Sequence, residues 1–274
     1  MALLLVPSAG GASVRNHRLR SVHTWAFAIG DGDLRGNLVQ RYAGYDLLVV
    51  DGQGASRAQV GALRRAGKIV LAYLDVGTIE PGRPWYGSLK PYRLDYWPDW
   101  GEWYARVDAA GYRQAMVRRV APRILRKGFA GLFLDNTDMV ESHPRQTRGM
   151  RALVRALARL VHRRGELLFS QNGENSIRPM LRYYDGWNRE DVSSTYDFAR
   201  RRYVRQAPGE VSAAVRALRR IAAAGLLTLA TDYAAAGDAQ SAAAAIHTAC
   251  RAGALPFVSD IGLTRVPPRP ARCD

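Results

Sequence analysis

Short apolar segments alternate with amphipathic stretches along this chain, and this alternation constrains the fold more than any other feature of the sequence. Eight apolar segments recur, and most of them end in a polar or acidic residue. They are residues 23–30, 45–52, 68–77, 131–138, 166–173, 184–191, 226–233 and 255–262. Apolar runs of this length are typical of strands in a parallel sheet that is buried on both faces. The sixth segment is the least apolar and gives the weakest strand signal.

Amphipathic helices are predicted between these strands. In one of them Leu153, Leu157 and Val161 recur at helical spacing, and arginines occupy the opposite face. A glycine follows each predicted helix within two residues, at a place where a left-handed residue commonly ends a helix. The predicted helices cover residues 56–66, 111–127, 145–164, 210–224 and 238–251.

Strands that alternate with helices form βαβ units and a parallel sheet. Eight strands in about 250 residues predict a single-domain (β/α)8 barrel, the TIM-barrel fold, with a doubly wound open sheet as the second choice. The open sheet lacks support because no strand is followed by a dinucleotide or phosphate loop. We assign residues 21–274 to the barrel and residues 1–20 to an N-terminal arm or a trimmed export segment.

The formal net charge is +16, and arginine supplies almost all of the positive charge. Such a charge suits contact with nucleic acid or another anionic polymer. The arginines are spread over the predicted helices instead of gathered in one tail, so we expect a solvated basic surface and no nucleic-acid partner. We also expect a monomer. No apolar run approaches the roughly 18 residues that a membrane span needs. A bridge between the two cysteines, Cys250 and Cys273, stays open because neither has a local motif.

The longest insertion lies between the third strand and its helix, at residues 78–110, and it is rich in aromatic residues. Aromatic rings stack on the apolar faces of sugars or on bases, and they also let a long loop pack on itself. Both interpretations stay open. The aromatic residues are Trp85, Tyr86, Tyr92, Tyr96, Trp97, Trp100, Trp103 and Tyr104.

Acidic and amide residues gather at the strand ends, where a (β/α)8 barrel builds its site. They are Asp51, Asp75, Asp135, Asp138, Asn172, Glu174, Glu190, Asp191, Asp232 and Asp260. A divalent-metal site and a pair of catalytic carboxylates are the two chemistries that such a set permits. The five histidines include no HExxH or HxH spacing, so we expect no metal and no cofactor. A serine nucleophile also lacks support, because the chain has no GxSxG motif.

The carboxylate pair is the chemistry of a glycosidase. One acid protonates the leaving oxygen, and a second carboxylate attacks the sugar or activates water. We predict Asp135, at the end of the fourth strand, as nucleophile or base and Glu190, at the end of the sixth, as proton donor. Six further residues are predicted to contact the sugar: Tyr73, Asp75, Asn136, Asp138, Asn172 and Asp232.

Five segments in order resemble the endo-α-1,4-polygalactosaminidase family, glycoside hydrolase family 114, over most of residues 23–264. They are residues 73–83, 134–138, 170–174, 188–191 and 231–233. The resemblance implies a (β/α)8 barrel that cleaves α-1,4-linked galactosamine-containing polymers, such as those of microbial biofilms. The family's catalytic Asp and Glu match Asp135 and Glu190. The resemblance also implies a secreted or extracytoplasmic protein, although the N-terminal residues lack the pattern of a signal peptide.

Three positions depart from the family pattern and bear on polymer specificity more than on the fold. Leu134 replaces a proline, Arg189 stands where an acid is common, and Asp75 replaces a small residue. The charge of +16 also opposes a cationic polymer, unless local acids reverse the field or the glycan is acetylated. The alternative prediction is therefore a barrel that binds glycan or anionic polymer without cleaving it.

Overall fold

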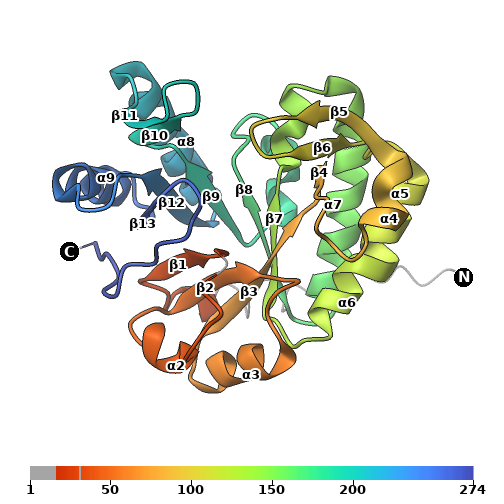
Figure 1. The fold of residues 1–274 in the computed structure, drawn as a ribbon, viewed down its shortest axis with the longest axis horizontal. Helices are drawn as coiled ribbons and strands as arrows, with labels where there is room; N and C mark the ends of the chain where they lie inside the picture. The colour runs from red at the N-terminus through yellow and green to blue at the C-terminus, as the bar shows by residue number, and fades with distance from the viewer. Residues whose placement is uncertain (1–16, 31, 274) are drawn as a thin grey trace, which may run out of the picture.

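Eight parallel strands form a nearly closed barrel in the computed structural model, which describes residues 17–30 and 32–273 (Figure 1). The order in the sheet is β1-β2-β3-β7-β8-β9-β12-β13. The predicted single-domain (β/α)8 barrel is confirmed, including its weakest strand, β9. Residues 1–16 of the expected N-terminal arm lie outside the described residues. The strands are β1 (Trp25–Ala28), β2 (Leu47–Asp51), β3 (Ile69–Asp75), β7 (Gly131–Asp135), β8 (Leu167–Gln171), β9 (Gly186–Glu190), β12 (Leu227–Tyr233) and β13 (Leu255–Ser259).

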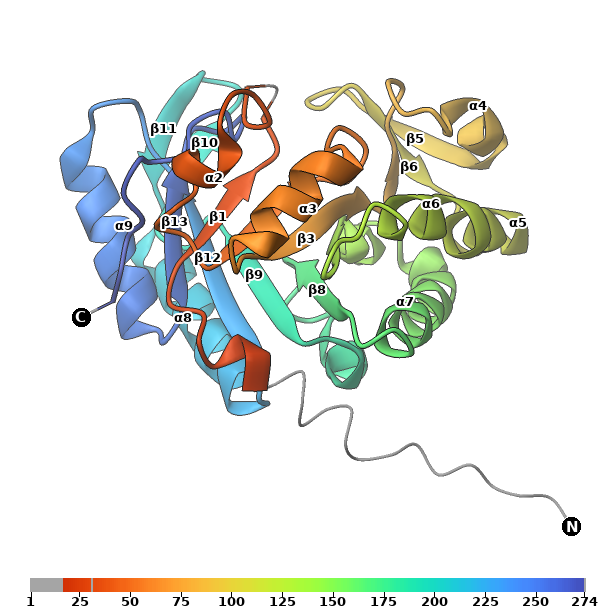
Figure 2. The same ribbon diagram turned by 90° about the horizontal axis from the view of Figure 1, so that it is seen from below.

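Helices lie outside the strands (Figure 2). Only the very short α2 follows β1, only the 3-10 turn η5 follows β8, and no helix follows β13 among the described residues. Five long helical patterns therefore accompany the eight strands. The helix predicted over residues 111–127 consists of α5, the π-helical turn η2 and α6. The helical segments are α2 (Leu38–Arg41), α3 (Arg57–Arg65), α4 (Tyr86–Leu89), η1 (Lys90–Tyr92), α5 (Ala110–Ala115), η2 (Met116–Val120), α6 (Ala121–Leu125), η3 (Thr137–Glu141), η4 (Pro144–Gln146), α7 (Thr147–His162), η5 (Arg178–Tyr183), α8 (Pro208–Ala223) and α9 (Ala239–Arg251).

Two small antiparallel sheets stand at the carboxyl end of the barrel, and the sequence pattern did not predict them. The insertion at residues 78–110 forms β4 (Thr78–Ile79), β5 (Arg93–Trp97) and β6 (Glu102–Ala105). The segment after β9 forms the hairpin of β10 (Ser194–Asp197) and β11 (Arg202–Arg205). Figure 2 shows both sheets at the same end of the molecule. They flank the place where the strand-end acids are expected.

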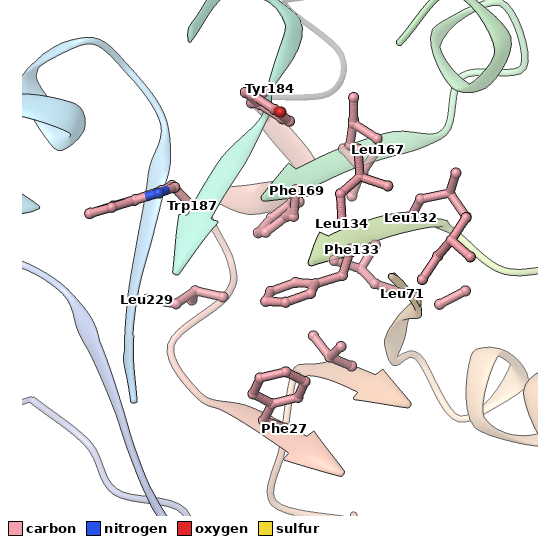
Figure 3. Packing of buried hydrophobic residues seen from close by; sticks show 14 of the residues in the cluster. Phe27, Leu71, Leu132, Phe133, Leu134, Leu167, Phe169, Tyr184, Trp187 and Leu229 are labelled. Carbon is pink, nitrogen blue, oxygen red and sulfur yellow. The ribbon is translucent and has the colours of Figure 1, made fainter. Parts of the chain in front are cut away.

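Alternate residues of the strands fill the barrel interior. The rings of Phe27, Phe133 and Phe169 point toward one another (Figure 3), and the first two have centroids 5.1 Å apart. Gly186 leaves room for the ring of Phe169, because a Cβ at this position would collide with it. Side chains alternate along each strand, so residues of the same parity nearer the carboxyl end point into the mouth of the barrel.

Side chains join the first and last strands of the sheet. The indole Nε1 of Trp25 donates to the carbonyl oxygen of Leu255 at 2.8 Å, and the ring of Trp25 packs on Phe257. Within residues 17–30 and 32–273, no backbone ladder pairs β1 with β13. The barrel therefore closes through this tryptophan.

A disulfide joins α9 to the C-terminal segment. Its partners are Cys250 and Cys273, the pair that the sequence left open. In the described part of the chain, no helix combines the length and the apolar character that a membrane span requires.

Candidate active site

Asp135 and Glu190 converge at the carboxyl end of the barrel. Asp135 ends β7 and Glu190 ends β9, and Gln171 ends the strand between them. The Nε2 of Gln171 donates to Asp135 Oδ1 at 3.1 Å and to Glu190 Oε2 at 2.7 Å. Because one nitrogen reaches both acceptors, these two oxygens lie no more than about 6 Å apart. Two carboxyl groups predicted from separate strands therefore share one site.

Three donors hold the carboxylate of Asp135. Besides Gln171, the Tyr73 hydroxyl donates to Oδ2 and the backbone N–H of Asn136 donates to Oδ1, each at 2.6 Å. Asn136 adopts a left-handed conformation, with φ of 52°, and its backbone passes where a Cβ on Gly77 would stand. Burial raises the pKa of Asp135 well above its usual range, the charges of Asp75 and Glu190 add to this, and the Tyr73 hydrogen bond opposes it.

Glu190 is held in a similar way from the other side. Asn172 Nδ2 donates to Oε2 at 2.8 Å, and the Tyr233 hydroxyl donates to Oε1. Burial and then the charge of Asp191 raise the pKa of Glu190 to about 7, while the hydrogen bonds from Tyr233 and Asn172 oppose the rise. Since the pKa of each carboxyl is raised, the pair holds a proton to higher pH than isolated carboxyl groups do.

A cavity of about 190 Å³ opens above the pair. Five acidic side chains line it, and no Lys or Arg does among the described residues. Five of the six predicted sugar-contacting residues line it as well: Tyr73, Asp75, Asn136, Asp138 and Asn172. The acids of the lining are Asp75, Glu102, Asp135, Asp138 and Glu190. A strongly basic chain thus presents a cavity in which, among the described residues, every charged side chain is acidic.

The chain matches a known family over nearly its whole length. The family model described as glycoside-hydrolase family GH114 matches residues 8–269. The chain belongs to glycoside hydrolase family 114. It is therefore a glycoside hydrolase, as the sequence motifs predicted. The cavity lies at the carboxyl ends of the strands, the face on which (β/α)8 barrels build their sites.

Solved structures share the fold of this family 114 chain at low sequence identity. The glycoside hydrolase domain of PelA from Pseudomonas aeruginosa is 23% identical with a TM-score of 0.75, and the match covers 90% of this chain and 97% of that one. Ega3 from Aspergillus fumigatus, solved in complex with galactosamine, is 18% identical with a TM-score of 0.67, covering 92% and 95%. An α-galactosidase from Thermus thermophilus is 11% identical with a TM-score of 0.57, covering 93% and 63%. No curated protein matches the chain.

Two tryptophans of the aromatic insertion reach the cavity of this family 114 hydrolase. Trp97 and Trp100 line it, and Trp97 stacks on Tyr104 with ring centroids 5.2 Å apart. Trp100 also contacts Phe198 of the β10–β11 hairpin. Trp85 packs against the hydrophobic core instead. The insertion therefore both packs on itself and forms an aromatic edge of the cavity.

Asp232, the sixth predicted sugar contact, has a different place. Its carboxylate accepts the backbone N–H groups of Ser193 and Ser194, each at 2.7 Å, and hydrogen bonds from both serine hydroxyls. It is not among the described residues that line the cavity. In the sheet Thr231 pairs with Glu190, so parity directs Thr231 and Tyr233 inward and Asp232 outward. Asp232 anchors the start of the β10–β11 hairpin.

Three polar residues of the cavity were not singled out from the sequence. Gln171 and Tyr233 lie inside segments that carry the family resemblance, and their parity on β8 and β12 is the signal that identifies them. Glu102 comes from β6 in the insertion, where no strand was predicted. The pattern of the sequence contains no comparable signal for Glu102.

Proposed function

We propose that this family 114 hydrolase cleaves α-1,4-linked galactosamine-containing polysaccharide at internal linkages of the polymer, with Asp135 and Glu190 as its catalytic carboxylates. The observation that carries the proposal is the amide of Gln171, which bonds to both carboxyl groups. A barrel that only bound glycan would have no need to bring two buried acids together, because their repulsion costs free energy. This geometry favours hydrolysis over the non-catalytic alternative.

The acidic cavity supports an amino sugar as the substrate. The lining holds five carboxyl groups and, among the described residues, no Lys or Arg, so the only charges it presents are negative and an ammonium-bearing sugar is attracted there in spite of the charge of +16. A neutral N-acetyl sugar gains less from the same field. Ega3, which shares the fold, has galactosamine bound in its structure.

The separation of the carboxyl groups supports retention of configuration. Retaining glycosidases hold the two groups about 5–5.5 Å apart, whereas inverting enzymes need about 6.5–9.5 Å to admit a water. The shared amide of Gln171 holds Asp135 Oδ1 and Glu190 Oε2 no more than about 6 Å apart, below the separation that inverting enzymes need. In this mechanism Asp135 attacks the anomeric carbon while Glu190 protonates the leaving oxygen. Glu190 then takes a proton from the water that hydrolyses the glycosyl–Asp135 ester.

The two shortest hydrogen bonds at Asp135 and the charge beside Glu190 support this division of roles. Tyr73 and the backbone N–H of Asn136 each donate at 2.6 Å to Asp135 and stabilise the ionised form that a nucleophile needs. The charge of Asp191 beside Glu190 favours the protonated form that an acid needs. With the pKa of Glu190 raised to about 7, kcat/KM is expected to fall as pH rises above about 7, because the donor loses its proton.

The test is hydrolysis of a deacetylated α-1,4-galactosamine polymer by the wild type, Asp135→Asn and Glu190→Gln, with NMR of the anomer first released. We expect each variant to lose about 10³-fold in kcat and the product to keep its configuration. Glu210→Gln, on the exposed start of α8, is the control. Unchanged turnover in Glu190→Gln would remove Glu190 from the mechanism. Hydrolysis of no amino-sugar polymer by the wild type would favour the binding alternative.

A further inference from the structure

A second pair of carboxyl groups lies beside the first and shares a single hydroxyl. Thr78 Oγ1 is 2.6 Å from Asp75 Oδ2 and 2.6 Å from Glu102 Oε2. A hydroxyl has one hydrogen and can donate it to only one of two carboxylates. The other short contact therefore requires a proton on one of the carboxyl groups.

The hydrogen bonds around the pair place that proton on Glu102. Asp75 accepts the backbone N–H groups of Gly77 at 2.9 Å and Thr78 at 2.8 Å, and also the Nδ2 of Asn136 at 2.5 Å. Three N–H donors stabilise a carboxylate, so Asp75 is the ionised partner. Within the described residues, the Thr78 hydroxyl is the one hydrogen-bond partner of the Glu102 carboxyl group. Glu102 therefore donates to Thr78, and Thr78 donates to Asp75.

The electrostatic surroundings of Glu102 act in the same direction. Burial and the charge of Asp75 raise its pKa to about 8, and the charge of Glu80 adds to the rise. The one cation that opposes this, Arg83, is already paired with Glu80 at 2.6 Å and with Asp51 at 2.5 Å. Glu102 is thus the neutral acid of this second pair.

The position of Glu102 makes it accessible to a bound sugar. It lies on β6, in the same insertion that supplies Trp97 and Trp100, and it lines the cavity with them. The other four acids of the lining come from the ends of barrel strands or from η3. A sugar between the tryptophans and the catalytic pair therefore passes beside Glu102.

We propose that Glu102 recognises the ammonium group of the substrate by exchanging its own proton for that cation. When a 2-amino sugar binds, Glu102 releases its proton to solvent, and the resulting carboxylate pairs with the ammonium. An N-acetylated sugar carries no positive charge and leaves the proton on Glu102. Glu102 is a specificity residue in this scheme, which rests on the proposed amino-sugar substrate and separates deacetylated from acetylated units.

Glu102→Gln isolates the proposed role. The amide of a glutamine donates to Thr78 Oγ1 as the neutral acid does, so the empty site is preserved, but it cannot ionise. Binding of galactosamine oligomers at pH 7 is measured calorimetrically in buffers of different ionisation enthalpy. We expect the wild type to release nearly one more proton per ligand than Glu102→Gln. The KM of the variant for deacetylated oligomers should rise about tenfold with kcat within about twofold, the loss of one charge-assisted contact.

Two controls distinguish the outcomes. KM for N-acetylated oligomers should be the same in wild type and Glu102→Gln, and Glu210→Gln should behave as wild type in every assay. Equal proton release by wild type and Glu102→Gln, with equal KM, overturns the role of Glu102 and leaves the proposed hydrolase function standing. A wild type that neither binds nor cleaves deacetylated oligomers overturns both proposals.

Discussion

Gln171 links the two carboxyl groups that we propose as the catalytic pair, because its amide bonds to both Asp135 and Glu190. Gln171→Met keeps the length of the side chain and removes both hydrogen bonds. We expect kcat to fall about 100-fold as the pair loses its alignment. The alkaline limb of the pH–rate profile should move to higher pH, since loss of a donor raises the pKa of each carboxyl. Gln40→Met, at an exposed position, is the matched control, and an unshifted profile in Gln171→Met would contradict the bridging role.

At the residue scale, the sequence predicts which residues lie at strand ends better than it predicts which way their side chains point. Asp135 and Glu190 each end a barrel strand, and that position predicts that they reach the mouth of the barrel. Asp232 lies one residue before the end of β12, yet the pleat turns it away toward Ser193 and Ser194. Parity within β12 would have selected Tyr233 in its place. Strand ends and parity together predict the dyad and most of its donors.

At the element scale, the two insertions form the edge of the cavity. Trp100 lines the cavity and contacts Phe198 across the mouth. We expect Trp100→Ala to raise KM for long polymer about tenfold through the loss of a stacking surface, with kcat little changed. The comparison is with Tyr96→Ala, an exposed aromatic of the same insertion that packs on Trp103 and lies outside the cavity lining. An equal rise in KM for both variants would point to a general loosening of the insertion.

Insertion strands resist prediction for a physical reason. The barrel strands are buried on both faces and therefore appear as apolar runs, whereas β5 and β11 are short and mix charged with aromatic residues. Small sheets of this kind are stabilised by cross-strand pairs, such as Tyr96 with Trp103, that belong to different parts of the sequence. Glu102 was missed because its strand was missed.

At the scale of the whole molecule, the structure separates charge of opposite sign. The chain carries +16, with arginines on the outer helices such as α7, while five acids line the one cavity above the catalytic pair. The sequence predicts acids at the strand ends, but which of them share a cavity depends on barrel closure. The pairing of Cys250 with Cys273 likewise depends on the tertiary structure, which brings the two Cα atoms to 5.3 Å from each other. No local motif encodes that separation.

Buried acids should make the stability of the whole molecule depend on pH. Burial raises the pKa of Asp33 and Asp232 to about 6 and that of Glu190 to about 7. In the unfolded chain these groups have pKa values of about 4. Between about pH 4 and pH 8 the folded state therefore binds more protons than the unfolded state. The stability that these protonated groups contribute is fully present below their pKa values in the unfolded chain, and it is lost as pH rises through their pKa values in the folded state.

We expect the free energy of unfolding to fall by at least about 3 kcal/mol from pH 5 to pH 8, measured by urea titration at constant ionic strength. Asp33→Asn removes one buried titrating group and should flatten this slope around pH 6, because its amide stays neutral in both states. Asp99→Asn, at an exposed position, should leave the slope unchanged. Stability that is constant or rises across this range would mean that the buried carboxyl groups ionise at their ordinary pKa values. The raised pKa of Glu190, and with it the proton that we assign to the proposed catalytic pair, would then be contradicted.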